Sequence, residues 1–168
     1  MRVTRFDHCS LHGPNIDGVV EFFTEVLDFS LTEAAETPDG TAAAFLSCSN
    51  KAHDIAFIGR AEPGKFHHVA FSLDSWHEVG QAADIIARCD IPLDIGPSRH
   101  GITRGQTIYF FDPSGHRLEL TVRTEHDPKR IKQFESEAPK VLHLWDQTHD
   151  WSQREKAFGG KTGYSRNV

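Results

Sequence analysis

The sequence predicts an α+β fold in which two βαβββ modules pair into one curved, partly closed mixed sheet. The first observation behind this prediction is an internal repeat. Arg5-Phe6-Asp7-His8-Cys9 returns as Lys65-Phe66-His67-His68-Val69, at an offset of about 60 residues. The second is that a helical pattern and several short strand patterns follow each run in the same order. A unit of about 60 residues buries little surface alone, so the two copies are expected to share one sheet.

Each repeat opens on a run rich in β-forming residues, which predicts strands at about 3–10 and 66–73. An amphipathic helix follows each strand, with Asp74 as the expected N-cap of the second helix. The apolar residues that recur on one helical face are Val19, Phe22, Phe23, Val26 and Leu27 in the first copy and Trp76, Val79, Ala83 and Ile86 in the second.

Short strands complete each module. They are expected at 30–36, 41–48 and 53–59, and again at 92–95, 106–112 and 116–122. The turns Pro38-Asp39-Gly40 and Asp112-Pro113-Ser114-Gly115 separate them, because proline presets φ and glycine accepts a positive φ. The modules therefore cover about 1–62 and 63–123. The polar tail, 124–168, is expected to form a helix or two against the sheet or a partner subunit.

Composition excludes several classes of protein. A net charge of −6 over 168 residues disfavours a nucleic-acid partner, which requires clustered Lys and Arg. No run reaches the roughly 18 to 20 apolar residues of a membrane span, and the N-terminus lacks a signal peptide's apolar stretch. We therefore expect a cytoplasmic protein with no membrane partner. Cys9, Cys48 and Cys89 form no Cys-x-x-Cys pair and are expected to be reduced.

Three residues form a candidate metal site. His8 and His68 occupy the same place in the two repeats, so the imidazoles can enter one cavity from opposite sides. Glu119 follows the second turn between Leu118 and Leu120, and a buried carboxylate there needs a partner. Two histidines and a carboxylate form the facial triad of non-heme Fe(II) oxygenases. A histidine on a strand is more often structural, however, and the pattern alone identifies neither metal nor substrate.

Five stretches make the chain similar to catechol 2,3-dioxygenases, type I extradiol enzymes of the vicinal-oxygen-chelate superfamily. The similarity runs in order over about residues 3–122 and is weak in the tail. The stretches are Phe6-Asp7-His8-Cys9, Lys51-Ala52-His53-Asp54-Ile55-Ala56-Phe57, His67-His68-Val69-Ala70-Phe71, Asp94-Ile95-Gly96-Pro97-Ser98-Arg99-His100-Gly101 and Ile108-Tyr109-Phe110-Phe111-Asp112-Pro113-Ser114-Gly115.

The resemblance implies a role for each candidate residue. It makes His8, His68 and Glu119 the ligands of Fe(II), although Mn(II) suits the same ligands. It makes His53 the acid–base residue near the O₂ site, and His100 and Tyr109 the groups that hydrogen-bond the catechol oxygens. His67 is expected on the opposite face of the strand from His68. The histidines that match no functional residue are His12, His67, His77, His116, His143 and His149.

The implied activity is extradiol ring cleavage, which inserts both atoms of O₂ into a catechol and yields a 2-hydroxymuconate-semialdehyde-type product. Familiar members are about twice as long, and this chain resembles their catalytic half, so residues 1–123 are the expected catalytic domain and a homo-oligomer is expected. Three alternatives remain: a Mn(II)-dependent dioxygenase, a metal-free small-molecule-sequestering protein of the same fold, and a glyoxalase-type lyase. The lyase usually needs a second glutamate, which the segment 55–58 lacks.

Overall fold

The computed structural model describes residues 1–37, 40–101 and 103–123, and these residues confirm the order of elements expected for two modules. The first module contains β1 (Arg5–Gly13), α1 (Ile16–Glu25), β2 (Ser30–Thr37), β3 (Gly40–Ser47) and β4 (Ile55–Gly59). The second contains β5 (Lys65–Ser72), α2 (Trp76–Arg88), β6 (Leu93–Arg99), β7 (Gln106–Phe111) and β8 (Arg117–Val122). The predicted tail lies outside the described residues, as do Pro38 and Asp39 of the first turn.

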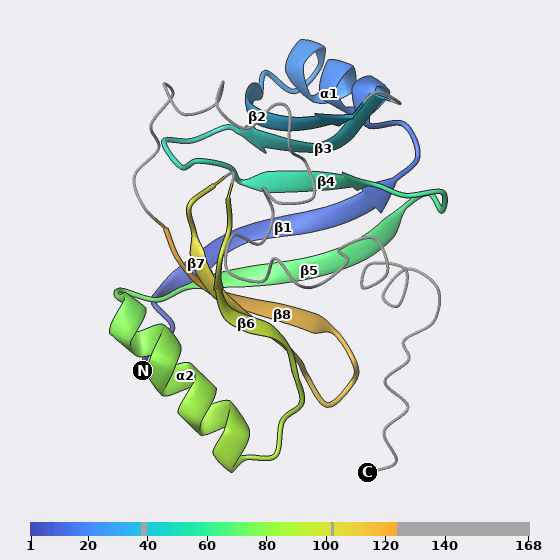
Figure 1. Ribbon diagram of the computed structural model, residues 1–168. Helices are drawn as coiled ribbons and strands as arrows, with labels where there is room; N and C mark the ends of the chain where they lie inside the picture. Colours follow the sequence, from blue (N-terminus) through green and yellow to red (C-terminus); the bar gives the residue numbers. More distant parts are fainter. Residues whose placement is uncertain (38–39, 102, 124–168) are drawn as a thin grey trace.

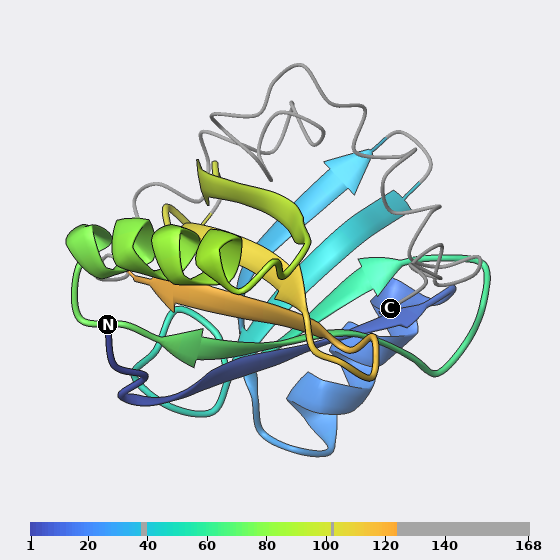
Figure 2. The same cartoon turned by 90° about the horizontal axis from the view of Figure 1, so that it is seen from below.

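One eight-stranded mixed sheet, in the order β2-β3-β4-β1-β5-β8-β7-β6, unites the two modules. The seam is the antiparallel pair β1–β5, and each of these strands pairs in parallel with the last strand of its own module, β4 or β8. The sheet is strongly twisted, with α1 and α2 against different halves of it (Figures 1 and 2). The prediction of two modules that pair into one curved mixed sheet is therefore confirmed, and the sheet does not close, because β2 and β6 remain its two edges.

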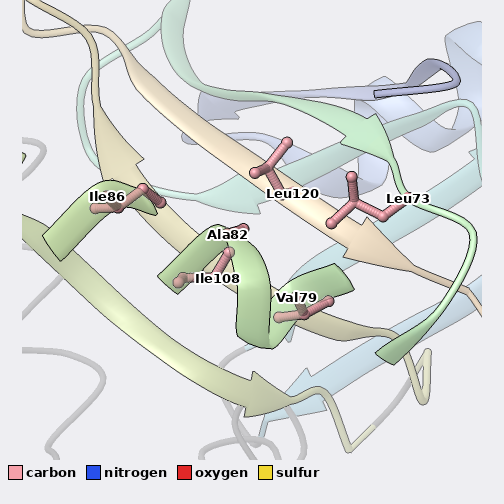
Figure 3. Packing of buried hydrophobic residues seen from close by; sticks show 6 residues of the cluster. All are labelled: Leu73, Val79, Ala82, Ile86, Ile108 and Leu120. Atoms are coloured by element: carbon pink, nitrogen blue, oxygen red, sulfur yellow. The ribbon is translucent and has the colours of Figure 1, made fainter. Parts of the chain in front are cut away.

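Each module has an apolar core of its own between its helix and its half of the sheet. Figure 3 shows how side chains of α2 meet those of β7, β8 and the segment after β5. That core contains Leu73, Val79, Ala82, Ile86, Ile108 and Leu120. The core under α1 contains Ile16, Ala44, Leu46 and Phe57. These two sets of core residues do not overlap. The faces of the strands that point away from the helices line a cavity near the β1–β5 seam.

Two local predictions had different outcomes. The turn at 112–115 is confirmed, because Asp112 Oδ1 accepts hydrogen bonds from the amides of Ser114 and His116, and Gly115 has a φ of +83°. The N-cap prediction for α2 was wrong by one residue: Ser75 is the N-cap. The amide of Asp74 instead donates to the Glu78 carboxylate at 2.9 Å.

None of the helices in the described part of the chain is long and apolar enough to cross a membrane.

Candidate metal centre

Two β-bulges at the seam aim the central histidines into one cavity. In the β1–β5 ladder, Phe6 and His8 lie opposite the consecutive residues Phe71 and Ala70, which leaves Asp7 as an extra residue. His67 is the extra residue on β5, by the same kind of register shift. A bulge places two neighbouring residues on one face of a strand. Both strands consequently have the same order of exposed and buried residues, in which two exposed residues are followed by two buried ones.

The side chains of His8, His68 and Glu119 converge in this cavity. His8 Nε2 and His68 Nε2 lie 3.0 Å apart, and Glu119 Oε2 lies 3.2 Å from the first and 3.0 Å from the second. All three residues are buried, and they form a group of potential metal ligands in the described part of the chain. The structure therefore brings together the three residues that the sequence predicted as ligands.

The two oxygens of Glu119 have different surroundings. Oε1 accepts a hydrogen bond from Thr107 Oγ1 at 2.6 Å and lies 3.3 Å from His100 Nε2. Oε2 is buried and has no hydrogen bond to any residue that the structure describes, although the Nε2 atoms of His8 and His68 are close to it. Burial opposes ionisation, but the imidazoles of His100, His68 and His8 hold the pKa of Glu119 well below its usual range. The carboxylate thus has one anchored oxygen and one free to bind a cation.

The residues at the bulges support the imidazoles from behind. Asp7 is fully buried, and its Oδ1 lies 2.8 Å from His8 Nδ1 while its Oδ2 accepts a hydrogen bond from Ser72 Oγ at 2.6 Å. Burial opposes ionisation of Asp7, but His8 and Arg123 lower its pKa. A carboxylate on the far nitrogen is the usual outer partner of a metal-binding histidine, because it leaves the lone pair on Nε2.

His67 contradicts the prediction that it faces away from His68. Its Nδ1 lies 2.7 Å from His68 Nδ1, and both residues line the cavity. The bulge, which alternation cannot reveal, is the physical reason. His12 is also buried, with its ring centroid 4.7 Å from that of His67, whereas His77 and His116 are exposed as expected. His143 and His149 lie outside the described residues.

His53, His100 and Tyr109 also line the cavity, as the resemblance implied. His100 Nε2 lies 2.8 Å from the Tyr109 hydroxyl, beside Glu119. The ring centroid of His53 is 4.4 Å from that of His8, and its buried Nε2 has no hydrogen-bond partner among residues 1–37, 40–101 and 103–123. Burial, followed by the charge of Arg123, holds the pKa of His53 well below its usual range.

Sequence reasoning missed Asp7, Thr107 and Arg123. Asp7 is next to a candidate ligand, but strict alternation places it on the other face. Thr107 gave no signal, because its contact with Glu119 depends on the β7–β8 pairing. Arg123, just after β8, contacts the Asp7 carboxylate and comes within 3.3 Å of His53 Nδ1.

The ligand atoms fit a divalent metal. Three ligands at about 2.1 Å on mutually perpendicular bonds would be about 3.0 Å apart, against about 3.4 Å for a tetrahedral set. The measured separations of 3.0, 3.0 and 3.2 Å match the perpendicular arrangement. Two nitrogens and one carboxylate oxygen on one face of an octahedron suit Fe(II) and leave positions open for other ligands.

The register of the first module shows why the site has one carboxylate. Ala56 pairs with Ser10 as Glu119 pairs with Ala70, so Ala56 is the structural counterpart of Glu119. Ala56 is buried and lines the same cavity. A second carboxylate ligand is therefore absent from the place where a four-ligand glyoxalase-type set would have it.

Three known proteins illustrate what this chain is similar to. It is 56% identical over 121 residues to the metapyrocatechase of Pseudomonas sp. (strain CF600), a match that covers 71% of this chain and 39% of that protein. It is 33% identical to the manganese-dependent 2,3-dihydroxybiphenyl 1,2-dioxygenase of Geobacillus genomosp. 3, covering 69% of this chain and 38% of that protein. The crystal structure of the 2,3-dioxygenase LapB from Pseudomonas sp. KL28 superposes with a TM-score of 0.71 at 49% identity, covering 74% of this chain and 44% of the other.

The chain thus spans about two fifths of the length of the curated relatives that it matches. A model of the Glyoxalase/Bleomycin resistance protein/Dioxygenase superfamily matches residues 5–120, which is most of the region that the structure describes. The pairing of two βαβββ modules around a cavity with the His8–His68–Glu119 group agrees with that match. This chain belongs to the Glyoxalase/Bleomycin resistance protein/Dioxygenase superfamily.

Proposed function

We propose that this chain is an extradiol dioxygenase, which uses Fe(II) and O₂ to open a catechol ring beside its two hydroxyl groups. The observation that supports this proposal most strongly is the triangle of His8 Nε2, His68 Nε2 and Glu119 Oε2, with sides of 3.0 to 3.2 Å. The similarity to a metapyrocatechase and to a solved 2,3-dioxygenase supports the reaction type. We infer that residues 1–123 form the catalytic domain.

In the proposed mechanism, His8, His68 and Glu119 hold the iron. When bound, Fe(II) would supply Lewis-acid polarisation of the catechol oxygens and electrons for the reaction with O₂. The Asp7 carboxylate keeps the proton of His8 on Nδ1, and Thr107 fixes Oε1 of Glu119. These contacts fix the orientation of both ligands.

The remaining residues of the cavity bind and orient the substrates. The hydrogen-bonded His100–Tyr109 pair lies beside Glu119 and can orient the catechol oxygens. Phe45, Ala56 and Ile58 form an apolar wall that can exclude water around the ring. His53 Nε2, which has no hydrogen-bond partner in the described part of the chain, can donate a hydrogen bond to an oxygen in the cavity and transfer its proton there as the ring opens.

The proposal includes two further statements, on the metal and on self-association. Fe(II) is the proposed metal, with Mn(II) as the alternative because a relative of 33% identity is described as manganese-dependent. Self-association is proposed because Phe6 and Phe66, on neighbouring strands of the seam, are 53% and 45% exposed. Sedimentation equilibrium tests it: a monomer at micromolar concentration would contradict it.

The test of the proposed function is to load the full chain anaerobically with Fe(II), then add catechol and air. We expect a yellow semialdehyde product with one O₂ consumed for each catechol. Glu119→Ala, which removes the only carboxylate of the triangle, should abolish both signals. Product formed by the variant at the wild-type rate would contradict the assigned ligand set.

Two outcomes distinguish the alternatives. Activity that appears with Mn(II) and not with Fe(II) would replace the metal while keeping the reaction. A chain that binds catechols but retains no metal after dialysis would contradict the dioxygenase and support the small-molecule-sequestering protein. A matched control is Asp112→Asn, a substitution in the turn before β8, which should leave activity within about twofold.

A further inference from the structure

Arg123 places a cation at the edge of the cavity that contains the His8–His68–Glu119 group. It directly follows β8, its side chain is 11% exposed, and it lines the cavity. Its Nε and Nη2 atoms both contact Oδ1 of the buried Asp7. Because a buried carboxylate balances its charge and fixes its position, the guanidinium is a built part of the site.

The third nitrogen of this guanidinium reaches His53. Arg123 Nη1 lies 3.3 Å from His53 Nδ1, in a geometry that satisfies a hydrogen bond. A guanidinium has five N–H donors, has no acceptor and remains charged. His53 Nδ1 must therefore accept, and a neutral imidazole that accepts at Nδ1 carries its proton on Nε2.

Nε2 is the atom of His53 that remains available to a ligand. It is buried and forms no hydrogen bond within the described part of the chain. His53 is 3% exposed, with its ring against those of His8 and Phe45 at centroid distances of 4.4 and 5.0 Å. An unpaired buried N–H is unfavourable, and a ligand in the cavity that accepts a hydrogen bond from it removes that cost.

We propose that Arg123 is a positioning residue that holds His53 in the Nε2–H tautomer, so that a donor N–H faces whatever binds at the candidate metal centre. The group that accepts from it is an oxygen with a negative or partial negative charge. This inference deepens the proposed function and depends on it for the identity of that oxygen. The tautomer itself depends only on the Arg123–His53 contact.

The same guanidinium connects His53 to the ligand His8. Nη2 lies 2.8 Å from His8 Nδ1, which is also 2.8 Å from Asp7 Oδ1. Coordination of a metal through Nε2 requires the proton of His8 on Nδ1, and Asp7 Oδ1 can accept from it. Arg123 Nη2 contacts the same Oδ1, so the approach of Nη2 to His8 Nδ1 joins two donors that share one acceptor. His53 Nδ1 has Arg123 as its hydrogen-bond partner instead. Arg123 thereby joins Asp7 on β1, which supports the candidate ligand His8, to His53 in the loop before β4, which is the proposed proton donor.

The test measures the His53 tautomer by ¹⁵N NMR on the full chain with ring-labelled histidine, with and without Zn(II). His53→Gln identifies the signals by their loss. The wild type should show a single tautomer with the proton on Nε2. Arg123→Met should lose this preference. Arg123→Lys should lose it too while remaining folded, because one ammonium can pair with Asp7 but cannot span both partners.

A matched control is Lys51→Met, because Lys51 Nζ also contacts Asp7, through the backbone carbonyl at 2.5 Å, and no contact joins it to His53. Its His53 tautomer should equal that of the wild type. A wild-type proton on Nδ1, or tautomers unchanged in both Arg123 variants, would overturn the inference. The metal-free spectra give this answer even if the proposed dioxygenase activity fails.

Kinetics give a second readout if the Fe(II)-loaded chain is active. Arg123→Lys should lower kcat about 10-fold, with KM for catechol within about threefold, because only the proton donor is misplaced. The double variant with His53→Gln should be no slower than His53→Gln alone, since the two residues act as one unit. Additive losses would mean that Arg123 acts through another route and would overturn the assignment.

Discussion

Two rows of buried side chains cross the sheet, one built mainly by each module. The rows occupy equivalent backbone positions in the two modules but carry chemically different side chains. Within each row, every residue is the register partner of the next one on the adjacent strand. The first row is Glu33, Phe45, Ala56, Ser10 and His68. The second is Ile95, Tyr109, Glu119, Ala70 and His8. Each row ends on the histidine of the other module, so the repeat by itself supplies two candidate ligands that face each other.

The rows differ in where each has its carboxylate. In the second row Glu119 is on β8, next to the seam, where it reaches both imidazoles. In the first row Glu33 is on the edge strand β2, and Ala56 occupies the inner position. The repeated backbone therefore forms the cavity, and single side chains decide which half completes the candidate metal site.

The largest expected effect comes from moving the carboxylate between rows. Glu119→Ala should weaken metal binding and lower activity by about 1,000-fold or more, because the metal's contribution amounts to several kcal/mol. Adding Ala56→Glu to this variant should restore at least about tenfold in metal affinity, because position 56 mirrors position 119. Competition with a chromophoric chelator measures both. Ala56→Gln in the same background should restore nothing, and a failure of Ala56→Glu would contradict the mirror relation.

The next prediction tests whether the two modules unfold together as one cooperative domain. Leu46→Ala and Ile108→Ala each remove a fully buried side chain, one from each core. Each should lower the free energy of unfolding by about 2 to 5 kcal/mol, whereas Ile108→Val should cost about 0.5 to 1.5 kcal/mol. Urea unfolding should remain a single transition, because the β1–β5 seam joins the halves. Two separate transitions would show that the modules unfold independently.

A third effect concerns the carboxyl group in the first row. Glu33 is 5% exposed, and its Oε2 has no hydrogen bond to another described residue. Burial raises the pKa of Glu33 from 4.5 to about 7, although Arg123 opposes the shift. A raised pKa in the folded state stabilises the fold below pH 4.5, and that stabilisation is lost as pH rises to about 7. Glu33→Gln should therefore gain up to about 3 kcal/mol over the wild type between pH 4.5 and pH 8. Urea unfolding at both pH values measures this, and a pH-independent difference would contradict it.

The smallest effect compares the two bulge residues. Asp7→Asn should weaken metal binding about 10- to 100-fold, because the charged partner of His8 Nδ1 is lost. His67→Gln should cost less than about tenfold in metal affinity, because glutamine can still hydrogen-bond to His68 Nδ1 and no carboxylate is removed. Ser72→Ala, which removes a donor to Asp7 Oδ2, is the control and should change affinity by less than about threefold. Equal losses at positions 7 and 67 would mean that charge at the bulge is irrelevant.

The modular repeat, the order of strands and helices along the chain, and the three candidate ligands could all be predicted from the sequence. Strand alternation, helical periodicity and turn residues are local signals, and His8 and His68 stand at matching places in a visible repeat. The turn at 112–115 was equally readable, because its residues specify their own backbone.

The other side chains that face the candidate ligands could not be predicted from the sequence, because strand pairing places them there. The bulges that turn Asp7 and His67 inward arise from the register between β1 and β5, and strict alternation predicts the opposite face. Thr107 and Arg123 reach Glu119 and His53 from other elements of the chain. A contact across a sheet depends on which distant segments pair and in what register. The spacing of residues along one segment does not predict that pairing.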